Sequence, residues 1–503
     1  MLQDLINALT AVDASCFIWI LVGLSVGIMV GALPGLNPST GIAIMLPFTY
    51  TMQVGPALVM LTSLYFGATF GGSISAILIG VPGTTSSVPT VWDGHAMQKK
   101  GEGAKAMGIA AIASMIGGVI GSLLLIVLTN QLADVALAFG NAEYFAICIF
   151  GLSIVSRLSG DNMAKCLLSM LLGLLLATVG VDPLWGATRF TFGISNLLEG
   201  IDFMPMLIGS FALVSVMKII EAGGDYNKIY KTQSPKMSKM IPKWREFKHW
   251  IRTCLMGSLI GTFIGVLPGA GPTISSFISY NQGKSFSKHP ELYGTGYGEA
   301  ICASESANNS AAPGAIAPML ALGVPGSGSA ALLMTAFIMQ GIRPGPQLFV
   351  TQADLLSTIT GSCFYANLLL LVVAIAGIKI WSRIVSIPNN MLIIMMLLFG
   401  MMGSFSVNYN MFSVLTMIVA GILGYFLDKC GVDIGPMTLG IVLGYMVEIN
   451  FRRALQVSNM DVTTFFTSPI SAVFLALAVI SVVSSLIPGK KQREAKKKTN
   501  QEE

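Results

Sequence analysis

The sequence predicts an all-α membrane protein that crosses the bilayer several times and contains two copies of one structural repeat. Three observations support this fold class. Hydrophobic residues make up 53% of the 503 residues and charged residues only 11%, whereas a soluble domain carries about 25% charge. Several apolar segments approach the length of about 20 residues that a membrane-spanning helix needs. Two motifs rich in glycine and proline each occur twice, in the same order.

Apolar segments mark the expected spans. They lie at 16–33, 107–129, 132–156, 164–180, 204–220, 253–267, 354–380, 391–403, 410–427, 434–447 and 469–487. Two further regions, 39–92 and 273–345, are apolar but interrupted by glycine, proline, serine and threonine. Proline removes a backbone donor and clashes with the preceding helical turn, so we expect both regions to be too broken for a continuous helix.

The duplication is visible in the two pairs of motifs. "GALPGLNPST" (31–40) and "GVLPGAGPTI" (265–274) agree at five of their first eight positions, with an offset of 234 residues (265 − 31). "GVPGTTS" (80–86) and "GVPGSGS" (323–329) agree at five of seven positions, with an offset of 243 residues (323 − 80). Recurrence in the same order predicts an internal repeat of roughly 240 residues.

The predicted organisation follows from this offset and from the charges. The first repeat occupies 1–240 and the second 250–487, and the remaining parts are site regions at about 31–95 and 265–345, other spans at about 107–220 and 354–487, a basic linker at 218–252 and a disordered tail at 488–503. Linker and tail are rich in lysine and arginine, so we expect both in the cytoplasm. The segment before the first span has Asp4 and Asp13 but no basic residue. An external N-terminus is therefore allowed, and the two repeats would then have inverted topology. We find no removable signal peptide.

The four motifs predict broken helices that surround a polar cavity. Glycine permits an unwound backbone, and serine, threonine and asparagine cap a helix that restarts. Backbone groups freed inside lipid cost several kcal/mol each unless protein or water satisfies them. Broken segments at matching places in two halves are typical of a transporter's binding site. The alternative is that the motifs are plain proline kinks or loops at the membrane surface.

The candidate substrate-binding residues lie in these motifs. They are Asn37, Pro38, Ser39, Gly83, Thr84, Thr85, Ser86, Gly271, Thr273, Gly326, Ser327, Gly328 and Ser329. Their hydroxyl and N–H groups suit a carboxylate, and no lysine or arginine occurs within the motifs. Arg343 lies just outside them, either as a substrate contact or as a residue that reaches toward the membrane surface.

The most polar run inside an apolar region is "SESANNSAAPG" (304–314). Glu305, Ser306, Asn308 and Asn309 offer oxygen ligands, which hard cations prefer. We predict a Na⁺ site at Ser306, Asn308 and Asn309, with helix capping as the alternative role of these residues. Asp93 and His95 in "WDGHAM" are interpreted as the polar end of a hairpin. No catalytic constellation, metal-ligand spacing or nucleotide-binding motif stands out, so neither an enzyme nor an ATP-driven protein is expected.

The chain resembles the large membrane subunit of the tripartite tricarboxylate transporter family over nearly its whole length. The similar stretches include "GALPGLNPSTGIAIMLPFTY", "YFGATFGGSISAILIGVPGTTSSVPTVWDGHAM", "GVLPGAGPTISSFISY", "GEAICASESANNSAAPGAIAPMLALGVPGSGSAALL", "GIRPGPQLF" and "PMTLGIVLGYMVEINFRRAL". The long stretch from Glu299 to Ser329 is the most specific of them. One departure is Asn37, where the family more often has glycine.

The resemblance implies a secondary transporter of a bacterial inner membrane that imports a citrate-like di- or tricarboxylate by symport with a cation, with Na⁺ favoured over H⁺. It implies two partners, a small membrane subunit and a periplasmic substrate-binding protein. It also implies an elevator-type architecture with re-entrant helical hairpins, similar to the ion-transporter superfamily. A channel-like pore subunit and an intramembrane enzyme are the alternative functions.

Overall fold

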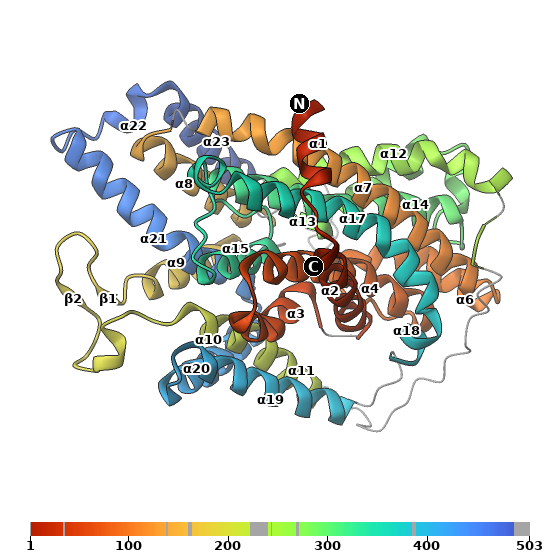
Figure 1. Cartoon of the computed structure of the whole chain (residues 1–503), viewed down its shortest axis with the longest axis horizontal. Helices are drawn as coiled ribbons and strands as arrows, with labels where there is room; N and C mark the ends of the chain where they lie inside the picture. The colour runs from red at the N-terminus through yellow and green to blue at the C-terminus, as the bar shows by residue number, and fades with distance from the viewer. Residues whose placement is uncertain are drawn as a thin grey trace, which may run out of the picture.

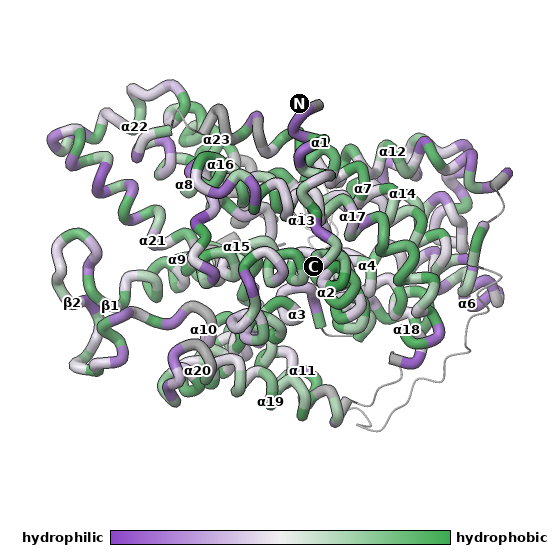
Figure 2. The backbone as a smooth tube through the Cα atoms, in the orientation of Figure 1, coloured by the Kyte–Doolittle hydropathy of each residue, from purple (hydrophilic) through white to green (hydrophobic). Residues whose placement is uncertain are grey.

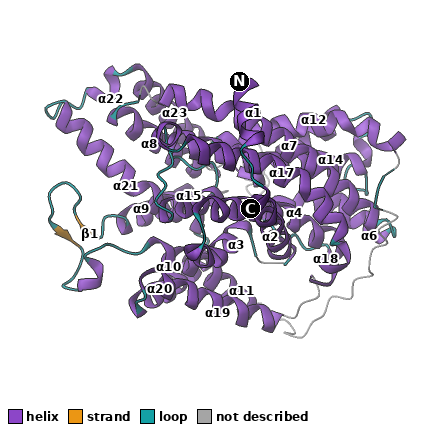
Figure 3. Ribbon diagram, in the orientation of Figure 1, coloured by secondary structure: helices purple, strands orange, loops and turns teal. Residues whose placement is uncertain are grey.

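The computed structural model describes residues 2–33, 36–136, 139–158, 163–221, 240–242, 244–267, 271–384 and 389–486. This part of the chain is almost entirely helical, and its one sheet is a two-stranded antiparallel hairpin (Figures 1 and 3). The all-α prediction is therefore confirmed. Most of the predicted linker (222–239), the tail and the dipeptides Pro34–Gly35 and Pro268–Gly269 lie outside the described residues.

The first half of the chain folds into short and long helices and one hairpin. In chain order its elements are α1 (Leu2–Thr10), α2 (Ala14–Ala32), α3 (Pro38–Met45), η1 (Leu46–Thr51), α4 (Val54–Ile79), η2 (Thr85–Ser87), α5 (Val88–Thr90), η3 (Val91–His95), α6 (Ala96–Lys99), α7 (Gly103–Ala136), α8 (Asn141–Leu158), α9 (Met163–Leu176), β1 (Gly180–Val181), β2 (Thr188–Arg189), η4 (Ser195–Leu197), α10 (Phe203–Ile208), η5 (Gly209–Leu213) and α11 (Val214–Glu221). Of the η elements, η3 and η5 are π-helical turns and the others are 3₁₀ turns.

The second half of the chain is likewise built from helices. Its elements are α12 (Trp244–Val266), α13 (Gly271–Phe286), the 3₁₀ turn η7 (Pro290–Leu292), α14 (Gly298–Leu322), α15 (Gly328–Met339), α16 (Gln347–Thr351), α17 (Ala353–Ala376), α18 (Ile378–Ile384), α19 (Asn389–Asn408), α20 (Met411–Lys429), α21 (Ile434–Val457), α22 (Thr464–Thr467) and α23 (Pro469–Leu486).

The apolar segments of the sequence correspond to helices. Among the described helices, α2, α4, α7, α17 and α20 are long and apolar enough to cross a membrane. Hydrophobic residues cover most of the helices, while hydrophilic residues gather at chain turns such as the β1–β2 hairpin (Figure 2). Several such helices in one chain indicate a multi-pass membrane protein.

The prediction that regions 39–92 and 273–345 cannot contain a continuous helix is wrong. Helix α4 runs unbroken for 26 residues, and α14 runs unbroken for 25 residues through Pro313 and Pro318. Every residue of α14 is buried. Proline is tolerated inside a helix where neighbouring helices enclose it and satisfy the freed backbone groups. The chain breaks only at the ends of these helices, where the motifs lie.

Helix α2 packs on α4 in the same way as α12 packs on α14. A Cβ atom added to Gly27 would lie 2.3 Å from the carbonyl oxygen of Leu64, and one added to Gly261 would lie 2.3 Å from that of Ala307. These positions are related by the offsets of the motifs, 234 and 243 residues. Small residues at every fourth position let two helix backbones approach closely. The two stripes are Gly23, Gly27 and Gly31 on α2, and Gly257, Gly261 and Gly265 on α12.

Charged residues attach the β1–β2 hairpin to α21 at the periphery of the molecule (Figure 1). Arg452 donates to Asp182 Oδ2 at 2.6 Å, and Arg189 donates to Glu448 Oε1 at 2.5 Å. The Arg452 guanidinium holds the pKa of Asp182 well below its ordinary range. The Asp182 charge therefore stabilises the fold at neutral pH, and the contribution is lost as the pH falls through the lowered pKa.

Candidate functional site

The second motif of each half forms a tight turn that folds back on the preceding helix. Gly80 ends α4 and Gly323 ends α14, both in the left-handed conformation, with φ of 73° and 70°. Three residues later, the N–H of Gly83 donates to the Gly72 carbonyl at 3.2 Å, and the N–H of Gly326 donates to the Ala315 carbonyl at 3.1 Å. The two turns therefore have the same hydrogen-bond pattern.

Polar side chains cap the helices that restart after the breaks. Asn37 Oδ1 accepts from the Thr40 N–H at 2.8 Å at the start of α3. Ser327 Oγ accepts from the Ala330 N–H at 3.1 Å at the start of α15. Thr84 forms a capping box with Ser87. The prediction that asparagine, serine and threonine cap these helices is confirmed.

Hydroxyl groups join the first motif of each half to the second motif of the other half. Ser39 Oγ lies 2.9 Å from Ser329 Oγ, and Thr273 Oγ1 lies 2.8 Å from Thr85 Oγ1. Ser39 and Thr273 are counterparts at the offset of 234 residues, so the two contacts correspond to each other. Tyr65 OH lies 2.9 Å from Ser327 Oγ and adds a third contact between the halves. Segments that are distant in the sequence therefore form one polar site.

The predicted substrate-binding residues divide into two groups by their exposure. The buried group serves packing and capping, and contains Ser39, Gly83, Thr84, Ser86, Gly271, Gly326 and Ser327. The group with solvent-accessible surface contains Asn37, Pro38, Thr85, Thr273, Gly328 and Ser329. The second group comes from all four motifs and offers the atoms that a solute reaches first. Arg343 is exposed.

A buried polar cluster, Glu305, Asn308 and Asn309, lies in the middle of α14. The Glu305 carboxylate accepts from Ser73 Oγ at 2.6 Å, from Ser114 Oγ at 3.2 Å and from Thr90 Oγ1. These hydroxyls belong to α4, α7 and α5 of the other half. None of the three cluster side chains is solvent-accessible. Their position more than one turn from either helix end excludes the capping role that was the alternative for the two asparagines.

The asparagines of this cluster have side-chain oxygens without hydrogen bonds. Asn309 Nδ2 donates to Ser114 Oγ at 2.7 Å, and Asn308 Nδ2 donates to the Thr69 carbonyl at 3.2 Å. Within the described part of the chain, Oδ1 of each residue is buried and accepts no hydrogen bond. A buried unsatisfied oxygen is costly, and it is the kind of atom that binds a cation. Ser306 lies apart, with its hydroxyl donating to the Cys302 carbonyl at 2.7 Å beside Gly257 of α12.

The interpretation of Asp93 as the polar end of a hairpin is wrong. Asp93 is fully buried and accepts from the N–H groups of Gly296 and Tyr297, each at 2.9 Å, and from Tyr280 OH at 2.8 Å. Its carboxylate fixes the loop before α14 against the first half of the chain. His95 Nδ1 lies 3.1 Å from the Ile77 carbonyl oxygen. Among the described residues, no group of three or more His, Cys, Asp or Glu side chains is placed to hold a metal ion.

Sequence reasoning missed Ser73, Thr90 and Ser114 as partners of Glu305. Each is a single small hydroxyl residue within an apolar or mixed stretch, with no motif around it. One signal was available, because a glutamate in an apolar segment needs several donors. Which residues supply them depends on how α4, α5 and α7 pack around α14.

The chain is similar to proteins of one transporter family. Residues 17–439 match the sequence model of the family described as "Tripartite tricarboxylate transporter TctA family". An Agrobacterium vitis protein described as an uncharacterised 52.8 kDa protein in the TAR-I ttuC' 3'region is 38% identical over 503 residues, covering 98% of this chain and 99% of the relative. An uncharacterised Agrobacterium vitis protein in the TAR-II ttuC' 3'region is 41% identical over 228 residues, covering 45% of this chain and 94% of the relative.

No solved structure matches the chain. The family match, in contrast, includes all four motifs, the buried polar cluster and most of the described helices. The protein therefore belongs to the tripartite tricarboxylate transporter TctA family.

Proposed function

We propose that this chain is the large permease subunit of a binding-protein-dependent secondary transporter that imports a di- or tricarboxylate together with cations. The observation that carries the proposal is the meeting of the four motifs through the Ser39–Ser329 and Thr85–Thr273 contacts. Helix starts and hydroxyl groups from both halves there offer donors to a carboxylate. The motifs contain no lysine or arginine, so co-transported cations and helix dipoles would balance the substrate charge.

Na⁺ is the proposed coupling ion. The free side-chain oxygens of Asn308 and Asn309 lie on the same helix as the Glu305 carboxylate, and hard cations prefer oxygen ligands. An inside-negative membrane potential opposes entry of an anion by about 2.3 kcal/mol per charge per 100 mV. The potential assists import only if the cations carry more charge than the substrate, which makes a cation site a requirement of this function.

The proposed mechanism is alternating access between two inverted repeats, with re-entrant hairpins at the four motifs, as in an elevator-type transporter. The equivalent packing of α2 on α4 and of α12 on α14 supports a repeat. The proposed setting is a bacterial inner membrane, where a small membrane subunit and a periplasmic substrate-binding protein complete the system. The binding protein would deliver the carboxylate to the motif residues.

Transport in proteoliposomes tests this function. The permease would be reconstituted with the small subunit and binding protein of its own organism, and uptake of radiolabelled citrate and of shorter dicarboxylates would be followed with and without an inward Na⁺ gradient. We expect saturable, concentrative uptake of at least one carboxylate that needs both the gradient and the binding protein. Flux that is non-saturable, merely downhill and independent of both would identify a channel and reject the proposal.

Joining the two halves at their hydroxyl contact should stop transport. The Ser39→Cys/Ser329→Cys protein, made without native cysteines, should form a disulfide under mild oxidation, because the two oxygens lie 2.9 Å apart. If the motifs separate during the cycle, uptake should fall more than about tenfold and return after reduction. The Ser39→Cys single variant, treated identically, is the control. A fully cross-linked protein that transports normally would show that this contact stays closed throughout the cycle.

A further inference from the structure

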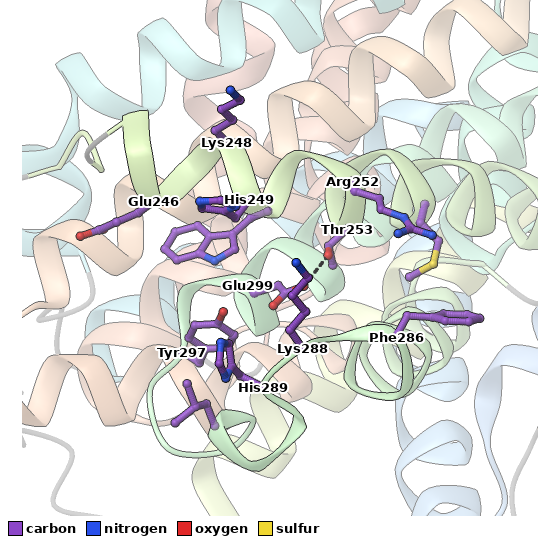
Figure 4. Close-up of a pocket in the computed structure, with 13 residues that line it drawn as sticks. Glu246, Lys248, His249, Arg252, Thr253, Phe286, Lys288, His289, Tyr297 and Glu299 are labelled. Carbon is purple, nitrogen blue, oxygen red and sulfur yellow. Dashed lines mark hydrogen bonds between the residues drawn. The ribbon is translucent and has the colours of Figure 1, made fainter.

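A pocket of about 950 Å³ lies away from the motif site, between the first turns of α12 and the loop that follows α13 (Figure 4). Lys248, His249 and Arg252 line it from α12, and Lys288 and His289 line it from the loop. All five basic side chains are exposed. The pocket therefore has a basic rim made by two segments that are separate in the sequence.

The acidic residues of the pocket do not neutralise this rim. Glu246 pairs with Lys105 at 2.6 Å. Glu299 is buried at the pocket floor and accepts from Thr253 Oγ1 at 2.7 Å and from Ser287 Oγ at 2.8 Å. With the described residues as possible partners, none of the three lysine and arginine side chains of the rim forms an ion pair or a hydrogen bond. Unpaired cations that line one concave site attract anions.

An exposed apolar face continues from this rim along α12. Leu255, Leu259 and Phe263 are 47%, 58% and 71% exposed, and their spacing of four residues places them on one side of the helix. The face begins one turn after Arg252, where the charged first turns of α12 give way to apolar sequence. In a membrane protein this change marks the boundary between headgroups and acyl chains.

We propose that the pocket binds the phosphate headgroup of an anionic phospholipid, with the acyl chains lying along Leu255, Leu259 and Phe263. Arg252 and Lys288 approach from opposite sides and supply charged donors to the phosphate. The apolar face selects a lipid over free phosphate, because free phosphate leaves that face without a partner. The lipid would also hold the C-terminal end of α13 to α12, and α13 begins at the motif that contains Thr273.

Lipid titration of the purified full-length protein in detergent tests the proposal. Bound lipid would be counted by native mass spectrometry, and thermal stability followed, with phosphatidylglycerol, with phosphatidylcholine of the same acyl chains, and with inorganic phosphate. We expect phosphatidylglycerol to bind and raise the melting temperature more than the other two. The Arg252→Gln/Lys288→Gln double variant should weaken this binding by about tenfold or more, since each phosphate contact is charge-assisted.

The matched control is Lys284→Gln, which removes an exposed charge from α13 outside the pocket. It should bind phosphatidylglycerol like the wild type. If the double variant does not fold, Lys288→Gln alone takes its place, because that residue lies in an exposed loop. Equal effects of phosphatidylcholine, or an effect of inorganic phosphate equal to that of the lipid, would overturn the proposal. None of these readouts requires transport, so the result stands independently of the proposed function.

Discussion

We expect Asn309→Ala to raise the Na⁺ concentration for half-maximal uptake by about tenfold or more, because it removes a buried oxygen that accepts no hydrogen bond within the described part of the chain and is placed to bind a cation. It also removes the donor to Ser114, a hydroxyl shared with Glu305. Docking of the binding protein should be unchanged, because Asn309 has no solvent-accessible surface. The measurement is initial uptake against Na⁺ concentration, together with the affinity of the binding protein for the permease.

Asn367→Ala is the matched control for this experiment. Asn367 on α17 is also fully buried, has a side-chain oxygen without a hydrogen bond in the described structure, and donates to Ser122 of α7 at 3.0 Å. Ser122 lies eight residues after Ser114 on the same helix, so the two substitutions cause similar packing losses at different places. We expect Asn367→Ala to leave the Na⁺ dependence unchanged. An unchanged dependence in Asn309→Ala would reject the assignment of Asn309 to the cation site.

Gly83→Ala should destabilise the protein and abolish uptake. A Cβ atom at Gly83 would lie 2.1 Å from the Gly31 carbonyl oxygen and 2.8 Å from Gly72 Cα. Both atoms belong to backbone, so no side-chain rotation relieves the clash. Overpacking typically costs about 1–3 kcal/mol, and contact with two fixed backbones favours the upper end. Gly326→Ala should behave alike, since its Cβ would lie 2.4 Å from the Gly265 carbonyl oxygen.

Gly328→Ala supplies the comparison within the same motif. An added Cβ there meets no atom of the described structure within 4 Å, so stability should change by less than about 0.5 kcal/mol. Thermal unfolding of the purified variants would measure all three changes. If Gly83→Ala and Gly328→Ala melt at the same temperature, the close approach of the first turn to α2 is not a constraint on the fold.

The sequence predicted the motif site better than it predicted the buried polar cluster. The capping roles of Asn37 and Ser327 depend on residues within the next three positions, so local chemistry was sufficient. The partners of Glu305 are separated from it by 191 to 232 residues. Their assembly depends on the rotation of several helices about their axes, and no pattern in one segment reports that.

Proline content misled the prediction for α14. Pro313 and Pro318 suggested a break, yet the helix continues through both. Propensity describes a helix in isolation, whereas α14 is buried on all sides by other helices. The burial of Asp93 has the same kind of cause, because its partners at Gly296 and Tyr297 come from the other half of the chain.

The sequence by itself determined the all-α membrane class, the positions of most helices and the pairing of the four motifs. Hydrophobicity and the backbone limits of glycine and proline act over a few turns, so they can be read from consecutive residues. Only the tertiary structure decided that Ser39 meets Ser329, that hydroxyls of three elements surround Glu305, and that Arg252 and Lys288 share a pocket. These contacts arise from close packing between distant segments, where small residues such as Gly27 and Gly261 set how near two helices lie.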